Sequence, residues 1–422
     1  MKRVAILEKQ PIFPFNEPAC ELRVLNKPLK IHQRDVLLKH CDSVIEYPSF
    51  DQIPRQDKSE MLVYYDNVFF DQPFIDVFVS EAKKRGKACR VAFSKSDQAI
   101  TRHALHLQDG IHLEGDVYVS NLWYYPNGIE DDPKPLVIDT QATEIGYYHI
   151  PTYMASDKGE IVYYVPLRAF LSIEHWIHVF MANTPFGIFA EGARFEAQIK
   201  RLPVKLGIML KGMWERKQVL SSSKLVRVGK NTSINPTAQI QGPTYIGDNC
   251  SIGPGVIIQN SIIGNNVTLM QGAQVMLSVI SDNCYLPFRA AIFMSTLMER
   301  CIVAQNVCLQ VCVVGRNTFI GSGTTFTDFK LIPKPILALR NGRHEPTGLS
   351  VVGGCVGHNC RIGSGLIIYP ARAIESDTIL IPTEEHNIIS KTVYYEQSDH
   401  HRLRERDTEL HRPLYRPETP PG

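Results

Sequence analysis

Glycine is missing from the start of this 422-residue chain, where the first glycine is Gly86. The first apolar stretch, Val4–Leu7, is followed instead by Glu8-Lys9-Gln10-Pro11-Ile12-Phe13-Pro14. Backbone N–H groups can approach a phosphate group closely only where side chains are absent, and each proline removes one such donor. The sequence therefore excludes a glycine-rich phosphate-binding loop after the first predicted strand.

Three other signals are also absent. No apolar run approaches the ~20 residues that a membrane-spanning helix needs, and the acid at Glu8 comes too early for a signal peptide, so we expect a cytoplasmic protein. None of the 10 cysteines forms a Cys-x-x-Cys pair, which argues against disulfides and structural zinc. The formal net charge is only +2 and no basic stripe carries interleaved aromatic residues, so nucleic acid is not an expected partner.

Charged side chains are scarce between residues 228 and 326, where only seven occur. They are Lys230, Asp248, Asp282, Arg289, Glu299, Arg300 and Arg316. A solvated surface normally carries more charge, so we expect other copies of the chain to cover some outer faces of this region.

The same region contains aliphatic residues that recur in steps of six, six and five, which gives a period of 17 residues. The five repeats are Ile246, Ile252, Ile258; Ile263, Leu269, Val275; Ile280, Leu286, Ile292; Leu297, Val303, Leu309; and Val314, Ile320, Phe326. Glycine often follows the leading aliphatic residue, and a small or compact residue such as Cys284 or Cys301 lies four positions after it. This period predicts a solenoid of short, stacked parallel strands over residues 224–384, interrupted by an insertion at 327–350.

The remaining sequence divides into three regions. Residues 1–165 alternate predicted strands (Val4–Leu7, Met61–Tyr65, Val91–Phe93, Val117–Val119, Leu136–Ile138) with a predicted helix at Pro73–Arg85, which indicates an open α/β sheet. Residues 166–223 form a helical linker region, with helical spacing over Leu167–Met181 and Phe195–Val219. Residues 385–422 have the composition of a disordered tail.

The second helical stretch is rich in basic residues and carries apolar residues that can share one face. These are Leu202, Leu206, Met209, Met213 and Trp214. Such a face either touches a membrane surface or packs against neighbouring domains, and the sequence leaves both open.

Two segments resemble a known family. Pro14-Phe15 and Pro18-Ala19-Cys20-Glu21-Leu22-Arg23 lie near the start, and the coils are joined by Thr347-Gly348-Leu349 leading to Gly353-Gly354-Cys355-Val356-Gly357. Together with the two-domain order, they resemble the sugar-1-phosphate nucleotidyltransferases related to bifunctional UDP-N-acetylglucosamine pyrophosphorylase/glucosamine-1-phosphate acetyltransferase, in their divergent branch. The resemblance covers most of residues 1–382. It implies a nucleotidyltransferase-like α/β domain, a left-handed parallel β-helix, a homotrimer, and a sugar phosphate or nucleotide sugar as ligand.

The resemblance also implies site residues in the first domain. Asp66, which follows the strand Met61–Tyr65, matches the acid with which family members hold Mg2+, and Asn67 follows it. Glu21 and Arg23 of the opening motif match the substrate- or nucleotide-binding positions. The alternatives are that Asp66 caps the next turn and that Arg23 forms a surface ion pair with Glu21 or Glu17.

The insertion is the candidate site of the second domain. It carries Lys330, Lys334, Arg340, Arg343 and His344 between nearly uncharged coils. Such a basic excursion is suited to an anion or to the phosphates of coenzyme A, with His344 as candidate base, so acetyl-CoA is a candidate co-substrate. The alternative is a solvated loop that closes over a neighbour.

Two functions remain open. The retained two-domain order favours a transferase of sugar-nucleotide metabolism, active as a nucleotidyltransferase, an acyltransferase or both. The missing glycine loop favours a catalytically lapsed paralogue that binds a sugar nucleotide or acts as an oligomeric scaffold. Gln305 also favours the second reading, because it lies where related β-helices carry a catalytic histidine and cannot act as a general base.

Overall fold

The computed structural model describes residues 1–149, 160–199, 202–330, 332, 334–384, 386–403 and 411–416. The chain separates into two compact units. The N-terminal unit contains Met1–Ile12 and Glu17–Ala190, and the β-helix unit contains Phe13–Asn16 and Glu191–Gly422. The short segment Phe13–Asn16 therefore belongs to the unit that the second half of the chain forms.

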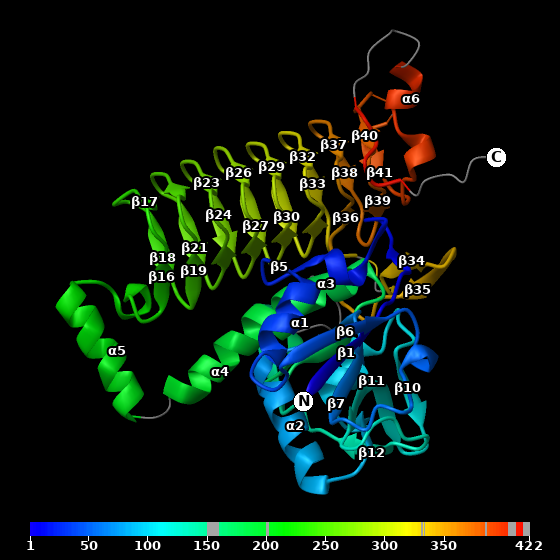
Figure 1. Cartoon of the computed structure of the whole chain (residues 1–422). Coiled ribbons are helices and arrows are strands. Elements are labelled where there is room, and N and C mark those ends of the chain that lie inside the picture. Colours follow the sequence, from blue (N-terminus) through cyan, green and yellow to red (C-terminus); the bar gives the residue numbers. More distant parts are fainter. Residues whose placement is uncertain are drawn as a thin grey trace. The chain divides into compact units, whose positions relative to one another are not determined.

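A seven-stranded sheet forms the centre of the N-terminal unit, with the order β12-β9-β11-β7-β1-β6 and with β10 attached to β11 (Figure 1). Strand β1 pairs in parallel with β6 and β7, whereas β11 is antiparallel to β7 and β9. The strands are β1 (Lys2–Ile6), β6 (Ser43–Tyr47), β7 (Met61–Tyr65), β9 (Cys89–Ser94), β10 (Ile111–Glu114), β11 (Val117–Tyr125) and β12 (Lys134–Val137). The α/β class predicted for this part of the chain is confirmed.

Helix α2 (Gln72–Arg85) begins and ends where its sequence signals predict. The Asp71 carboxylate accepts a hydrogen bond from the Phe74 N–H at 2.9 Å and so caps the first turn. Gly86 ends the helix at a φ of 62°, a left-handed conformation that costs glycine little because it has no Cβ. The buried residues Phe74, Ile75, Phe78 and Val79 attach one face of the helix to the core.

Shorter elements complete the unit. The helical spacing over Leu167–Met181 is misleading, because Phe170–Ser172 is strand β15, which pairs with β8 (Val68–Phe70), and α3 (Trp176–Asn183) begins only after His175. The other elements are β2 (Pro11–Ile12), β3 (Glu17–Pro18), η1 (Ala19–Glu21), β4 (Arg23–Val24), β5 (Lys27–Pro28), α1 (Leu29–Leu37), η2 (Phe50–Gln52), η3 (Ile100–Ala104), β13 (Ala142–His149), β14 (Glu160–Pro166) and η4 (Thr184–Phe189).

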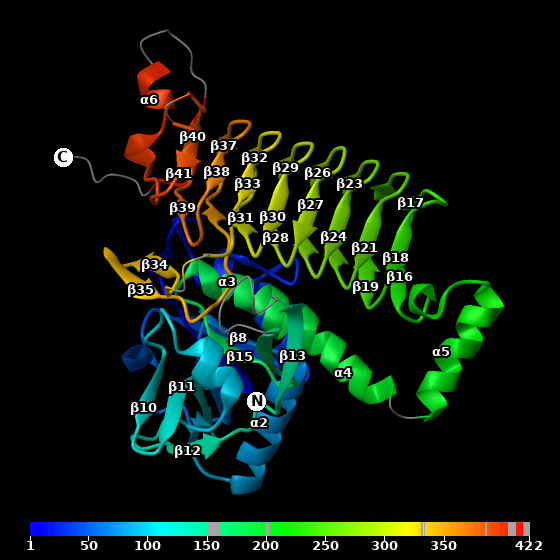
Figure 2. The same cartoon turned by 180° about the vertical axis from the view of Figure 1, so that it is seen from behind.

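The second unit is a left-handed parallel β-helix with three parallel eight-stranded sheets (Figure 2). The first sheet has β16 (Val226–Val228), β19 (Thr244–Ile246), β22 (Ile262–Ile263), β25 (Val279–Ile280), β28 (Thr296–Leu297), β31 (Val313–Val314), β36 (Cys355–Val356) and β39 (Ala373–Ile374). The second has β17 (Ser233–Ile234), β20 (Ser251–Ile252), β23 (Thr268–Leu269), β26 (Tyr285–Leu286), β29 (Ile302–Val303), β32 (Phe319–Ile320), β37 (Arg361–Ile362) and β40 (Ile379–Leu380). The third has β18 (Gln239–Gln241), β21 (Ile257–Gln259), β24 (Gln274–Met276), β27 (Ala291–Phe293), β30 (Cys308–Gln310), β33 (Thr325–Phe326), β38 (Ile367–Ile368) and β41 (Ile388–Ile389). Helices α4 (Ala190–Ile199), α5 (Leu202–Glu215) and η5 (Val219–Ser221) precede the first coil.

The aliphatic repeat forms the core of the β-helix, as its period predicts. Every residue of the five predicted repeats, from Ile246 to Phe326, is at most 2% exposed. Parallel pairing aligns equivalent residues of successive coils, for example Ile263 with Ile280. Cys284 and Cys301, at the positions with small residues, also point inward and are buried. These residues are small because they share the narrow interior with the aliphatic residues of the same coil.

Glycine and asparagine have different roles at one corner of the coils. A Cβ on Gly247 would lie 2.6 Å from the carbonyl oxygen of Gly264 in the next coil, so no side chain fits there. Two positions later, Asn249, Asn266 and Asn283 adopt a left-handed conformation with φ between 54° and 60°. Asparagine tolerates this conformation better than most residues, so the corner has a sequence signal beyond the glycine.

The insertion and the tail differ in how well the sequence predicts them. Within the insertion, β34 (Leu337–Arg340) and β35 (Arg343–Pro346) form an antiparallel hairpin, and β36 then pairs with β31. The expected disordered tail is instead ordered over 386–403 and 411–416, where β41 pairs with β38 and is followed by η6 (Tyr395–Gln397) and α6 (His400–Leu403). These segments cover a final coil whose backbone edge would otherwise have no partner. Residues 385, 404–410 and 417–422 of the predicted tail lie outside the described residues.

Candidate functional site

Three acidic residues lie at or near the carboxyl ends of adjacent parallel strands in the N-terminal unit. Glu8 follows β1, Asp66 follows β7, and Glu46 lies near the end of β6. In open α/β sheets, this edge is where ligands bind, because loops leave the sheet there and form a crevice. The edge is therefore the candidate site of this unit.

Asp66 is buried at this edge, with 5% of its surface exposed. Its Oδ1 atom accepts a hydrogen bond from the Glu8 N–H at 2.8 Å, and its carbonyl oxygen accepts one from Gln33 Nε2 at 2.9 Å. Burial raises the pKa of Asp66 to about 6, and the nearby charges of Glu8 and Glu46 add to this effect, although hydrogen bonds from the Glu8 N–H and the Cys20 thiol oppose it. The carboxyl group thus fastens the loop after β1, and its raised pKa means that it binds a proton more tightly than an ordinary aspartate does.

Cys20 is a neighbour of Asp66 that the sequence does not single out. Burial, followed by the charge of Asp66, raises the pKa of the Cys20 thiol to about 12. The sulfur therefore stays protonated and donates to the carboxylate, so it acts as a hydrogen-bonding partner and does not serve as a nucleophile.

Asn67 joins the edge to a second polar network. Its Nδ2 atom lies 3.4 Å from Ser172 Oγ, which donates to Glu174 Oε1 at 2.7 Å. The two carboxylate oxygens of Glu174 accept the N–H groups of Gly110 and Asp109, both at 2.7 Å. Ser172 and Glu174 were not expected from the sequence, because only the pairing of β15 with β8 brings them beside Asn67.

Two oxygen atoms at this edge are of the kind that a hard divalent cation prefers as ligands. The Oδ1 atom of Asn67 is buried and has no hydrogen-bond partner among the described residues, and Asp66 supplies a carboxylate whose ionised form a cation would stabilise. Within the same described part of the chain, no group of three or more His, Cys, Asp or Glu residues could hold a metal ion. Asp66 and Asn67 are thus the candidate ligands of a bound Mg2+, which would complete its shell with phosphate oxygens and water.

The opening motif is largely occupied by local contacts. Arg23 Nη1 donates to the Asn26 carbonyl oxygen at 2.8 Å, which closes the β4–β5 turn. Glu21 forms an ion pair with Lys30 at 2.5 Å. A role of Glu21 and Arg23 in ligand binding stays a prediction.

The segment Phe13–Asn16 follows the first strand, in the stretch where the sequence offers prolines in place of a glycine loop, and it packs within the β-helix unit. The Pro14 carbonyl oxygen accepts hydrogen bonds from the Ser376 N–H at 3.0 Å and from Ser376 Oγ at 2.9 Å. The ring of Phe15 lies 5.0 Å from that of His358. The segment is thus engaged in structural contacts.

The basic residues of the insertion do not form one cluster. Lys330 Nζ donates to the Pro335 carbonyl oxygen at 3.0 Å, and Arg372 Nη2 donates to the Leu337 carbonyl oxygen at 2.9 Å, so both cations lie at the base of the hairpin. Burial lowers the pKa of Lys330, and the charges of Arg372 and Lys334 lower it further. An anion beside these three cations would relieve their mutual repulsion. Arg372 was missed in the sequence because it lies in the resumed coils.

The other three insertion residues lie at the opposite end of the hairpin. Arg340 pairs in register with Arg343, and Leu339 pairs with His344, next to the Asn341–Gly342 turn. Arg340 is within 3.6 Å of Glu345 in an ion pair, whereas His344 and Arg343 are exposed. Because the hairpin arms are four residues long, about 10 Å separates this tip from the base.

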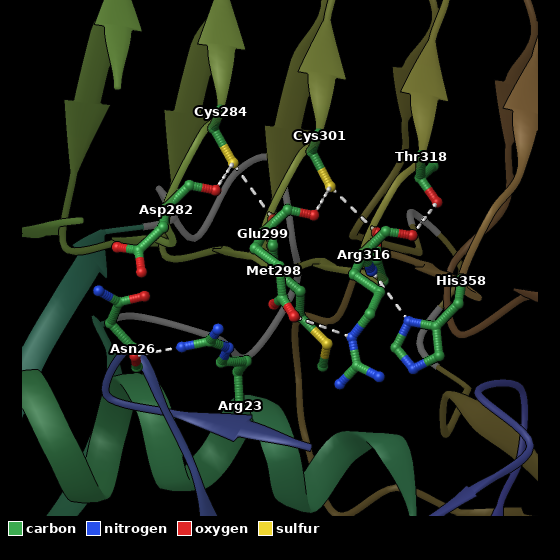
Figure 3. A network of polar contacts seen from close by, with 11 residues as sticks. Arg23, Asn26, Asp282, Cys284, Met298, Glu299, Cys301, Arg316, Thr318 and His358 are labelled. Atoms are coloured by element: carbon green, nitrogen blue, oxygen red, sulfur yellow. Dashed lines mark hydrogen bonds and ion pairs between the residues drawn. The ribbon is translucent and has the colours of Figure 1, made fainter. Parts of the chain in front are cut away.

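A ladder of contacts between coils accounts for the polar side chains near β28 and β31 (Figure 3). Glu299 forms an ion pair with Arg316 at 3.1 Å, and the Arg316 N–H donates to His358 Nδ1 at 2.9 Å. The Cys284 thiol donates to the Met298 carbonyl oxygen at 3.2 Å. These side chains hold one coil to the next, and His358 serves the structure as an acceptor.

Comparison with known proteins identifies one matching family. Residues 223–292 match the family described as the GMPPB C-terminal domain, a C-terminal domain of sugar nucleotidyltransferases. This confirms the predicted resemblance at that level, for part of the β-helix, whereas the specific branch stays a prediction. No curated protein matches the chain.

Solved structures also match the chain. One of them is described as a proposed acetyltransferase from Desulfovibrio desulfuricans G20, and it is 15% identical over 40% of this chain and 26% of that chain, with a TM-score of 0.20. At this TM-score the likeness supports no argument about activity. The matched part spans about a quarter of the other chain's length.

Proposed function

We propose that this protein is a transferase of sugar-nucleotide metabolism, and specifically a sugar-1-phosphate nucleotidyltransferase. The observation that carries the proposal is the pair of buried oxygens at the carboxyl edge of the central sheet: the Asp66 carboxylate, with a pKa raised to about 6, and the Asn67 Oδ1 atom. The match of residues 223–292 to a sugar nucleotidyltransferase C-terminal domain supports the same substrate class.

In the proposed reaction, a phosphate oxygen of the sugar-1-phosphate attacks the α-phosphorus of a nucleoside triphosphate, and the bond to the leaving pyrophosphate breaks. Mg2+, when bound, would neutralise part of the phosphate charge. The chain's own contribution is positional: the Glu8 N–H holds one oxygen of Asp66 at 2.8 Å, and the Glu174 carboxylate holds the loop of Asp109 and Gly110 through their N–H groups.

A pyrophosphate-release assay with Mg2+, run across sugar-1-phosphates and nucleoside triphosphates, tests this proposal. We expect Asp66→Ala to lower kcat/KM at least 100-fold, because it removes the charged ligand for the cation. Asp116→Ala is the matched control, since its carboxylate is fully exposed and forms a surface ion pair with Lys95. Turnover that survives Asp66→Ala unchanged would remove the metal role.

A catalytically lapsed, ligand-binding paralogue is the second candidate, and the Phe13–Asn16 segment favours it. Pro14 contacts Ser376 and Phe15 contacts His358. The segment that would have to carry a phosphate-binding loop therefore makes structural contacts. Under this reading, the protein binds a sugar nucleotide and releases no pyrophosphate. Calorimetric binding of a sugar nucleotide together with silence in the pyrophosphate assay would favour it over the enzyme.

Acyl transfer is a further part of the proposal, with acetyl-CoA as co-substrate. The cations Lys330, Lys334 and Arg372 at the hairpin base support a site for the phosphates of coenzyme A. We expect Lys330→Glu with Arg372→Glu to weaken acetyl-CoA binding at least tenfold. The double variant Arg343→Glu with His344→Ala changes the tip of the hairpin and should leave acetyl-CoA binding unchanged. If it weakens acetyl-CoA binding as much as the double variant at the hairpin base does, the site is not confined to the hairpin base.

The proposed active form is a cytoplasmic homotrimer. Tyr285, Ile302 and Phe319 occupy equivalent positions on the adjacent strands β26, β29 and β32, and each is between 36% and 42% exposed. A continuous column of large apolar side chains on the outside of a solenoid favours contact with another copy. Light scattering should give a trimer mass that Ile302→Glu lowers. None of the helices in the described part of the chain has the length and hydropathy of a membrane-spanning segment.

A further inference from the structure

One face of α5 (Leu202–Glu215) consists of large apolar side chains that the fold leaves exposed. At helical spacing, this face contains Leu202, Leu206, Met209, Leu210, Met213 and Trp214, each between 41% and 79% exposed. The sequence left open whether this face packs against a domain or contacts a membrane. An exposed face of this size and composition is uncommon on a soluble protein unless it binds something.

The opposite face of α5 already attaches the helix to its unit. Ile208 and Gly212 are buried, and a Cβ on Gly212 would lie 3.4 Å from the Val219 Cα atom. Glu215 accepts a hydrogen bond from the Ser223 N–H at 2.9 Å. Because these contacts hold the helix in place, the apolar face is free for another partner.

The charge around the apolar face selects the partner. Residues 200–217 contain six basic residues and one acidic residue, a net charge of +5. The one acid, Glu215, forms an ion pair with Lys211 at 3.4 Å, and the Lys211 ammonium lies 4.7 Å from the centre of the Trp214 ring. Lys205 on the helix and Lys217, two residues after its end, are also exposed. Basic side chains that flank an apolar, tryptophan-containing face complement an anionic lipid surface.

We propose that α5 binds to an anionic lipid surface and lies in its plane, with the apolar face among the acyl chains and the lysines at the headgroups. At 14 residues the helix is about 21 Å long, too short to span a hydrocarbon core of ~30 Å. A second copy is the less favoured occupant, because two such faces in contact would bring two strongly positive segments together. This inference is independent of the transferase proposal.

The test is flotation of the full chain with lipid vesicles, together with its tryptophan emission. The vesicles contain either phosphatidylcholine alone or phosphatidylcholine with 30% phosphatidylserine, a composition chosen to give about the charge of an anionic leaflet. Trp214 is 79% exposed, whereas Trp123 and Trp176 are at most 8% exposed, so a blue shift on vesicle addition reports on α5. We expect flotation and a blue shift with the anionic vesicles only, both reduced when salt is raised.

Substitutions on the helix separate the two contributions to binding. Leu210→Glu with Met213→Glu should weaken partitioning at least tenfold, and Lys205→Glu with Lys217→Glu should weaken it by about fivefold per lost basic residue. Leu38→Glu is the matched control, because Leu38 is 65% exposed and Leu210 is 63% exposed, yet Leu38 lies at the end of α1. Circular dichroism confirms that each variant is folded.

Four results would overturn the proposal. The first is that the chain floats with neither vesicle, and the second is that it floats equally with the neutral ones. The third is a self-association, seen by light scattering, that Leu210→Glu abolishes but that Ile302→Glu does not, which would assign the face to a second copy. Equal losses for Leu38→Glu and the α5 variants would also contradict a specific role of the helix.

Discussion

The buried carboxyl group of Asp66 makes the stability of the N-terminal unit depend on pH in a defined direction. Its pKa rises from 3.8 to about 6 on folding, chiefly through burial. Each pKa unit corresponds to ~1.4 kcal/mol, so ionising Asp66 in the folded state costs about 3 kcal/mol. Asp66→Asn removes this cost, because asparagine is neutral at every pH and still offers an oxygen to the Glu8 N–H.

The sign follows from which state holds the proton. Below pH 3.8, Asp66 is protonated in both states and makes no difference to stability. Between pH 3.8 and about 6, the unfolded chain loses its proton while the folded chain keeps it, so stability falls as pH rises. The free energy of unfolding of Asp66→Asn, minus that of the wild type, should therefore increase by about 3 kcal/mol from pH 3.5 to pH 7.5.

Urea unfolding at several pH values measures this difference. A Trp214→Phe background confines the fluorescence signal to Trp123 and Trp176, which are buried in the N-terminal unit. Asp116→Asn, at a fully exposed carboxylate, controls for the loss of one surface charge. Mg2+ bound to Asp66 would favour its ionised form, so saturating Mg2+ should narrow the difference at pH 7.5.

The result that refutes the reasoning is a difference that stays constant with pH, or one that becomes smaller as pH rises. Either would mean that Asp66 is ionised beside a partner that stabilises its charge. A correct pH profile that Mg2+ leaves unchanged would keep the buried carboxyl group but remove the metal.

Three further predictions concern the β-helix unit. Leu286→Ala should lower its free energy of unfolding by about 2–5 kcal/mol in urea, because Leu286 is fully buried; a loss below ~1 kcal/mol would contradict a packed interior. Gly357→Ala should destabilise the unit by ~2 kcal/mol or more, since the added Cβ would lie 2.4 Å from a backbone nitrogen. Gly192→Ala in α4 is the contrasting variant: its added Cβ would meet no atom within 4 Å, so it should stabilise the unit by up to ~1 kcal/mol. Asp377→Ala removes the carboxylate that accepts the N–H groups of Leu414 and Tyr415. Chymotrypsin, which cleaves after such residues, should therefore cut the segment 411–416 at least tenfold faster, and unchanged cleavage would show that other contacts hold the segment.

The candidate site was only partly predictable. Asp66 follows a buried strand, and its likeness to the acid of the resembled family singles it out in the sequence. Its partners Cys20 and Gln33 lie far from it in sequence and carry no periodic signal. Ser172 and Glu174 reach Asn67 only because β15 pairs with β8. At the base of the hairpin, Arg372 comes from a later coil and is not indicated by the composition of the insertion. Arg343 and His344, which belong to the insertion, lie at the hairpin tip instead.

By itself, the sequence determined the β-helix. Each coil contacts mainly its neighbours, so the core is a local repeat, and counting along the sequence places the fifteen repeat positions between Ile246 and Phe326 inside. Only the tertiary structure decided the placement of Phe13–Asn16, the ordered segments after β40, and the exposed face of α5. In these three places, the contacts of a residue depend on segments that are far away in the sequence. The spacing and the composition of a segment do not show whether such a distant segment covers its surface or leaves it exposed.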